Sequence, residues 1–134
     1  VHPVSTVSRL ASGVWTTGLL PATYRDAILE EQFLVLETNG SLVLLTGCSH
    51  PGIGNVVRHV SGMFPGREIS LVAGGFHLGK AGEGEIAEIS GRLLDYGVGR
   101  IAPSHCTGEE AIAWFRNEWG DRFVDFNLGD ELTL

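Results

Sequence analysis

The stretch LVLLTGCSHPGIGNVVRHV, residues 42–60, decides the fold because it holds a strand, a loop and a helix in succession. Four apolar residues at 42–45 predict a strand that is covered on both faces. The loop at 46–52 follows, and after it the apolar residues recur at helical spacing over 53–64. This order of elements is typical of α/β proteins.

The same order of elements occurs twice more downstream. A β-prone run at 69–73 leads through the loop GGFHL at 74–78 into a helix pattern. A third run at 100–103 leads through the loop at 104–108 into another helix pattern. Strands that alternate with helices of this length predict an α/β (or α+β) layer, with about three helices on one face of the sheet.

The region before these units divides into a hairpin and an irregular segment. Asn39-Gly40 separates an apolar run at 33–36 from the first strand described above, and this dipeptide between apolar runs predicts a β-hairpin. The sheet is therefore expected to be mixed. Residues 1–31 show little periodicity, so we predict an irregular entry segment with one candidate strand, followed by strand–loop–helix units over 32–134.

Composition limits the size of the core and the classes of partner. The chain of 134 residues has a formal charge of −7. A globular protein of this mass exposes about 6,800 Å², which is typical of one core, so we predict a single domain over 1–134. The acidic charge, with one lysine in the chain, argues against a nucleic-acid partner. The apolar runs are too short to span a bilayer, which argues against a membrane partner.

Two further features bear on the origin of the chain. The first residues lack a signal-peptide pattern, and two cysteines 58 positions apart do not make a disulfide framework. We therefore expect a cytoplasmic protein. The chain starts with Val1 and has its one methionine at position 63, so we also expect a fragment of a longer protein.

Each strand–loop–helix unit carries one histidine just past the end of its strand, namely His50, His77 and His105. Ligands of open α/β sheets bind at this edge, so the three imidazoles are expected to lie in one cleft. Three histidines suit Zn, Fe or Mn. The alternative is that each is a surface or hydrogen-bonded structural histidine.

Cysteines and glycines accompany these histidines. Cys48 and Cys106 lie within two residues of His50 and His105 in the sequence. Each thiol is a candidate contact to metal or substrate, and the alternative is a small buried apolar side chain. The loop glycines are candidates for holding an anion through open backbone N–H groups, and the residues predicted for this role are Gly52, Gly75 and Gly108.

The three loops together resemble the C-terminal half of metallo-β-lactamase-fold proteins. The resemblance rests on TGCSHPGI at 46–53 with Asn55, on GGFHL at 74–78 and on HCTG at 105–108. The subgroup that they resemble is the one named for 7,8-dihydropterin-6-methyl-4-(β-D-ribofuranosyl)-aminobenzene-5′-phosphate synthase, whose members are often described as metal-dependent hydrolases. The resemblance covers residues from about 32 to 134.

This resemblance implies half of a four-layer αββα sandwich, with the metals at the edge between the two halves. It implies that His50 and His105 are metal ligands and that His77 is a ligand or a substrate contact. Cys48 lies near the position where other members place a bridging carboxylate, so its role stays open. The implied cofactor is a divalent transition metal, with zinc expected first and iron or manganese as alternatives.

The family signature His-x-His-x-Asp-His is absent, because none of the five histidines has another two positions away. The resemblance therefore implies that the missing ligands come from a partner, either the N-terminal half of the same fold or a second copy in a homo-oligomer. Half a sandwich is also expected to leave one apolar sheet face exposed.

The function implied is that of a metal-dependent hydrolase-like half-domain. The complete protein is expected to act on a phosphate-bearing or pterin-type small molecule, as a hydrolase or a dihydropterin-type transferase, and this chain alone is expected to be inactive. The alternative from another class is a non-catalytic interaction module that binds no metal.

Overall fold

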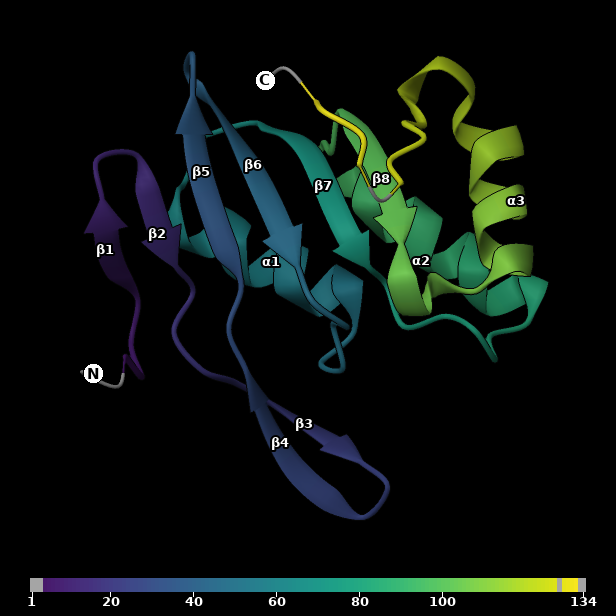
Figure 1. The fold of residues 1–134 in the computed structure, drawn as a ribbon, viewed down its shortest axis with the longest axis horizontal. Coiled ribbons are helices and arrows are strands. Elements are labelled where there is room, and N and C mark those ends of the chain that lie inside the picture. The colour runs from purple at the N-terminus through teal and green to yellow at the C-terminus, as the bar shows by residue number, and fades with distance from the viewer. Residues whose placement is uncertain (1–3, 128, 133–134) are drawn as a thin grey trace.

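The computed structural model describes residues 4–127 and 129–132, which form two sheets and three α-helices (Figure 1). The larger sheet has six strands in the order β1-β2-β5-β6-β7-β8. Its strands are β1 (Ser8–Ala11), β2 (Val14–Thr16), β5 (Leu34–Thr38), β6 (Ser41–Thr46), β7 (Ile69–Gly75) and β8 (Arg100–Ser104). The pairs β1–β2, β2–β5 and β5–β6 are antiparallel, whereas the pairs β6–β7 and β7–β8 are parallel, so the predicted mixed sheet is confirmed.

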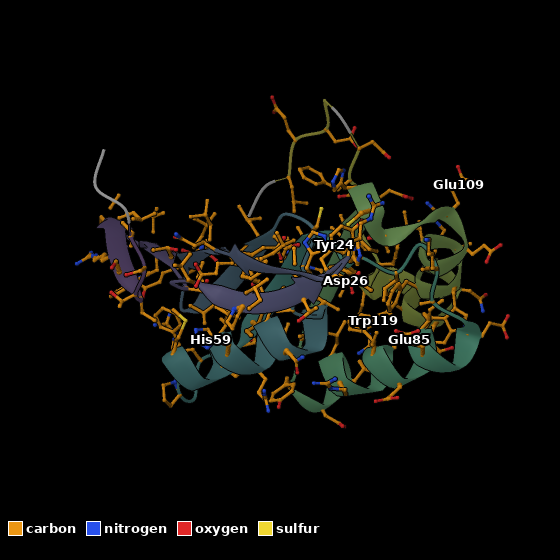
Figure 2. The ribbon with its side chains drawn as sticks, turned by 90° about the horizontal axis from the view of Figure 1, so that it is seen from below. Tyr24, Asp26, His59, Glu85, Glu109 and Trp119 are labelled. Atoms are coloured by element: carbon orange, nitrogen blue, oxygen red, sulfur yellow. The ribbon has the colours of Figure 1, made fainter. Side chains whose placement is uncertain are left out.

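Each parallel strand leads into a helix, as predicted. The helices are α1 (Ile53–Met63), α2 (Glu83–Asp95) and α3 (Glu109–Trp119), and a short 3-10 helix η1 (His105–Thr107) precedes α3. Figure 2 shows α1 and α2 side by side beneath the sheet. The main core contains residues of all three helices and of the sheet, including Val57, Leu93 and Phe115 with Leu44 and Val72. The α/β architecture with three helices on one face is therefore confirmed.

The far face of the sheet is covered in part by the chain itself. Val43, Leu71, Ala73 and Ala102 are 0–4% exposed there, and the C-terminal segment packs on them through Val124, Phe126 and Leu132. Leu42 and Leu44, the neighbours of Val43, are also buried, on the helix side. The apolar run at 42–45 is thus covered on both faces. The expectation that one apolar face of the sheet is exposed is therefore wrong for the centre of the sheet.

The expected irregular segment over 1–31 is wrong, because it holds four strands. β1 and β2 extend the main sheet, and β3 (Leu20–Tyr24) pairs with β4 (Ala27–Glu31) in a separate hairpin (Figure 1). The turn of this hairpin places Arg25 at φ 48° and Asp26 at φ 63°. Turns with two positive φ values normally take Asn-Gly, so the sequence gives no hairpin signal here.

The hairpin predicted at Asn39-Gly40 is confirmed, with φ of 40° and 94° at the two turn residues and Thr38 opposite Ser41. None of the helices in the described part of the chain is long and apolar enough to cross a membrane.

Candidate metal centre

Three loops meet at the carboxyl edge of the parallel strands. Thr46 at the end of β6 lies opposite Gly74 of β7, and Gly75 lies opposite Ser104 at the end of β8. The strand ends are therefore nearly level, and the residues that follow them emerge at one edge. As predicted, this places the loops that carry His50, His77 and His105 together.

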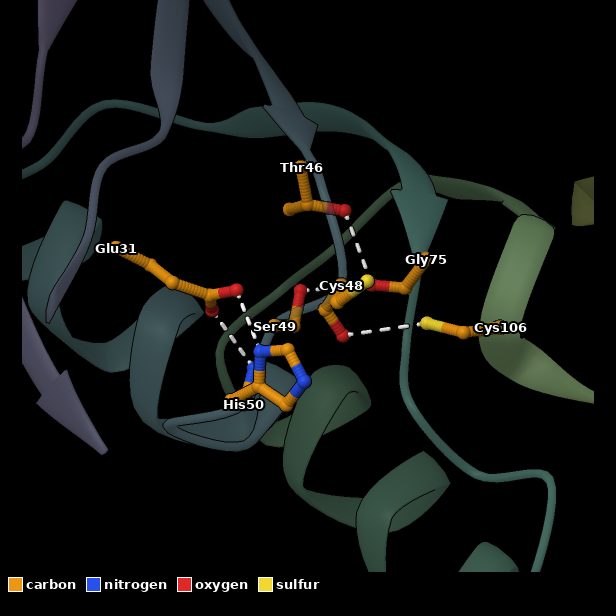
Figure 3. Close-up of polar contacts among 7 residues, drawn as sticks. All are labelled: Glu31, Thr46, Cys48, Ser49, His50, Gly75 and Cys106. Carbon is orange, nitrogen blue, oxygen red and sulfur yellow. Dashed lines mark hydrogen bonds and ion pairs between the residues drawn. The ribbon is translucent and has the colours of Figure 1, made fainter. Parts of the chain in front are cut away.

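Gly75 is the point of closest approach between these loops. Its backbone N–H donates to the Gly47 carbonyl at 2.9 Å, and the Ser49 hydroxyl donates to the Gly75 carbonyl at 2.7 Å (Figure 3). A Cβ at position 75 would lie 2.4 Å from the Gly47 oxygen and 2.8 Å from the Cys106 sulfur. Only glycine therefore fits.

We expect Gly75→Ala to destabilise the fold by about 1–3 kcal/mol, because the added methyl group must displace a backbone carbonyl and the Cys106 thiol. Gly91→Ala is the matched control: position 91 lies inside α2 with nothing within 4 Å of an added Cβ, so alanine there should stabilise the helix by about 0.5–1 kcal/mol. Urea unfolding of both variants measures the difference. Equal effects of the two substitutions would contradict the packing argument.

The other two predicted anion-binding glycines also have structural reasons for being glycine. Gly52 has φ 88° at the start of α1, and Gly108 has φ 86° at the start of α3. A Cβ on Gly108 would lie 2.6 Å from the Gly79 Cα. An anion-binding role for these backbones stays a prediction.

One group of possible donor atoms consists of the Cys48 and Cys106 sulfurs and a His105 ring nitrogen. These atoms lie within 4.8 Å of one another. The Cys106 thiol donates to the Cys48 carbonyl at 3.5 Å (Figure 3). His105 is exposed, and both cysteines are half-buried. We name this set the sulfur–imidazole group.

The sulfur–imidazole group fits a divalent metal by its chemistry and its spacing. Thiolate and imidazole are donors that zinc and iron accept. In a tetrahedral zinc site the donor atoms lie roughly 3.5–3.8 Å apart, as follows from Zn–S of about 2.3 Å and Zn–N of about 2.0 Å. The three donor atoms lie within 4.8 Å of one another, so the distances between them need to shorten by only about 1 Å to reach that geometry. Three donors leave a fourth position open.

A second group brings His50 and His77 together. Their ring centroids are 4.4 Å apart, and the Tyr24 ring packs against His50 at 4.6 Å and His77 at 5.4 Å. Glu31 holds His50 twice: one carboxylate oxygen contacts Nδ1 at 2.6 Å and the other accepts the backbone N–H at 2.8 Å (Figure 3). This leaves Nε2 of His50 as the nitrogen for any further ligand.

The pKa values of Cys48 and His77 shift away from the charged forms of these two side chains. Burial raises the pKa of the Cys48 thiol, and its hydrogen bond with Cys106 adds to the increase. Burial and the neighbouring His50 lower the pKa of His77, while the Glu31 carboxylate opposes that change. The lower pKa favours the neutral form of His77, which is the form that binds a metal or accepts a proton. Metal binding at Cys48 must displace the thiol proton.

The structure thus places the predicted site residues in two separate groups, which differ from the predicted ligand pair. His50 and His105 were predicted as the ligand pair, but His105 lies with the two cysteines and His50 lies with His77 and Glu31. Whether these residues bind metal stays a prediction. Tyr24 and Glu31 were missed, because they lie in the segment predicted to be irregular.

The chain is similar in sequence and in structure to known proteins, although no family model matches it. The chain is 34% identical over 107 residues to the 7,8-dihydropterin-6-methyl-4-(β-D-ribofuranosyl)-aminobenzene-5′-phosphate synthase of Methanocaldococcus jannaschii, which covers 78% of this chain and 35% of that protein. A second, uncharacterised protein of that organism is 35% identical over 91 residues, covering 66% of this chain and 31% of its own length.

A solved structure, Tm1679, is described as a metal-dependent hydrolase of the β-lactamase superfamily. It superposes with a TM-score of 0.82 at 30% identity, covering 96% of this chain and 56% of Tm1679. The chain spans about a third of the curated relatives and just over half of the solved structure.

Proposed function

We propose, for a chain that shares the fold of the metallo-β-lactamase superfamily, that it supplies part of the metal site of a metal-dependent hydrolase-like protein. The observation that carries this proposal is the sulfur–imidazole group, whose two sulfurs and one imidazole nitrogen lie within 4.8 Å of one another at the edge where the parallel strands end. The similarity to Tm1679, a metal-dependent hydrolase, supports it.

In this proposal the residues of the chain have separate roles. Cys48, His105 and Cys106 hold one divalent ion, for which zinc is the first candidate and iron or manganese the alternatives. A divalent ion held by these residues would supply an acidified water and would polarise a substrate oxygen. Glu31 fixes the orientation of the His50 imidazole, and neutral His77, exposed at the rim, accepts a proton at a ring nitrogen.

The reaction and the partner form the second part of the proposal. The name of the Methanocaldococcus relative, a synthase of a pterin-linked phosphate, supports a phosphate-bearing or pterin-type substrate. The remaining ligands come from the N-terminal half of the same fold, or from a second copy of the chain. Because the chain spans 56% of Tm1679, the first source is the one we favour.

Cobalt(II) tests the donor set directly. We expect the chain to take up one cobalt ion with a thiolate-to-cobalt absorption band in the near ultraviolet, because two of the three proposed donors are sulfurs. Cys106→Ser should reduce the intensity of that band by about half while the far-ultraviolet circular dichroism stays unchanged.

Ser49→Ala is the control for the cobalt experiment. It removes a neighbouring hydroxyl, bonded to the Gly75 carbonyl, but no proposed donor, so the absorption band should persist. A chain that takes up no cobalt, or a band that Cys106→Ser leaves unchanged, would favour the alternative of an interaction module without metal.

A further inference from the structure

A cavity of about 470 Å³ opens beside the sulfur–imidazole group. Three parts of the chain form its wall: the tip of the β3–β4 hairpin, the loop between β7 and α2 with the first turn of α2, and η1. The lining residues used below are Tyr24, Arg25, His77, Lys80, Glu85 and Cys106. Cys106 belongs to both the cavity and the proposed metal site, so a ligand in the cavity would lie next to the metal.

The charge in this cavity differs in sign from that of the chain. Arg25 and Lys80 each add one positive charge and Glu85 adds one negative charge, which leaves +1 in a chain of −7. Lys80 is the single lysine of the sequence. Within residues 4–127 and 129–132, neither cation makes a salt bridge to a carboxylate. Two cations that approach from different elements are suited to an anion with several oxygens.

The turn that positions Arg25 at the tip of the β3–β4 hairpin has a strained backbone. Arg25 and Asp26 both have positive φ in a two-residue turn, a conformation that Asn-Gly adopts with less strain. The Arg25 guanidinium lies 5.1 Å over the Tyr24 ring, and that ring packs against His50 and His77. Figure 2 labels Tyr24 and Asp26 at this tip, and Glu85 on the helix that forms another part of the cavity wall.

We propose that this cavity binds the phosphate group of a phosphorylated small molecule, with Arg25 and Lys80 as the anion-binding residues. The inference deepens the proposed function and rests on it for one point, that the phosphate lies beside a metal. The guanidinium of Arg25 donates hydrogen bonds to two phosphate oxygens, and Lys80 neutralises the remaining charge. The Glu85 carboxylate on the same wall repels the phosphate and weakens its binding. Neutralising Glu85 should therefore change the phosphate affinity in the opposite direction to neutralising Arg25 or Lys80.

The experiment measures phenyl phosphate and inorganic phosphate binding to the full chain by isothermal titration calorimetry, with acetate as the singly charged comparison. Arg25→Asn/Asp26→Gly places Asn-Gly in the turn, which should relax the hairpin and weaken phosphate binding at least about tenfold. Asp26→Gly alone keeps Arg25 and should bind like the unmodified chain. Lys80→Gln should weaken binding about tenfold, and Glu85→Gln should strengthen it about 2–5-fold.

The outcomes separate this inference from the proposed function. Phosphate binding that is lost in the Arg25→Asn/Asp26→Gly variant and kept in His105→Asn supports a site in the cavity. Binding that is lost in His105→Asn and kept in both Arg25→Asn/Asp26→Gly and Lys80→Gln means that phosphate sits on the metal, which overturns the inference and leaves the proposed metal site intact. Binding of acetate as strong as that of phosphate, or no binding of either, also overturns it.

Discussion

Replacing His105 with alanine is expected to lower the metal affinity of the chain by more than about 100-fold, so that a desalted, zinc-loaded sample retains almost no zinc. The reason is that three donors define the proposed site and His105 supplies its only nitrogen. Loss of an outer partner of a metal ligand already costs 10–100-fold in typical sites, so loss of a ligand costs more. Elemental analysis of the desalted protein measures the result.

The backbone at this position calls for a second variant. His105 has φ 53°, a conformation that asparagine tolerates better than alanine. His105→Asn therefore removes the imidazole with less strain, and both variants should lose zinc equally. The side chain is exposed, so the free energy of unfolding without metal should change by less than about 1 kcal/mol.

His59→Ala is the matched control for the zinc measurement. His59 is a half-buried histidine on α1 whose ring nitrogen contacts the Thr17 carbonyl at 3.2 Å, and it lies outside the sulfur–imidazole group (Figure 2). This variant should keep its zinc although it loses that contact. Zinc retained by His105→Ala and His105→Asn at the level of the control would end the assignment of His105 as a ligand.

The sequence predicted which loops meet, because that depends on strand order and direction. Apolar runs followed by helix patterns are sufficient to predict three parallel strands, and the ends of parallel strands lie at one edge. The loops that carry His50, His77 and His105 accordingly lie at this edge. A single cleft for the three imidazoles stays a prediction. The apolar run at 42–45 also predicted burial on both faces of the sheet, which the structure confirms.

The sequence could not predict that the side chains at this edge of the sheet form two separate groups. Side-chain direction in these loops depends on three non-glycine residues with positive φ, namely Ser49 at 60°, His77 at 55° and His105 at 53°. Such conformations are uncommon and leave no periodic signal. Glu31 is 19 positions from His50, in a hairpin whose Arg25-Asp26 turn lacks the usual residues. Sequence patterns predict helices and strands, whereas the contacts in the two groups depend on loop and turn conformations that no such pattern predicts.

Under the proposed function, co-expression with the part of Tm1679 that the chain does not cover is expected to give an active complex. The chain presents a surface of 7733 Å², whereas a compact protein of its mass exposes about 6,800 Å². The excess, roughly 900 Å², is close to what one partner buries in a standard interface, about 800 Å². Leu10 and Leu34, on β1 and β5, are 51% and 40% exposed and supply apolar contacts for such an interface.

The experiment co-expresses the chain with the part of Tm1679 that the chain does not cover. We expect the two polypeptides to co-purify, the zinc content to rise from about one to about two ions per complex, and hydrolysis of bis(4-nitrophenyl) phosphate to exceed that of the chain alone by at least about 100-fold. The added segment would supply the ligands for a second ion, and a second ion would supply charge stabilisation for the leaving oxygen.

The matched control for the co-expression is the same Tm1679 segment with every histidine changed to alanine. It should still pair with the chain, because pairing depends on apolar surface, but it should restore neither the second zinc nor the activity. Leu34→Asp should instead abolish pairing, because it places a charge in the expected apolar contact. If native mass spectrometry shows no pairing with the unmodified segment but shows a homo-oligomer of the chain that Leu34→Asp abolishes, then the further ligands come from a second copy and the favoured partner is wrong.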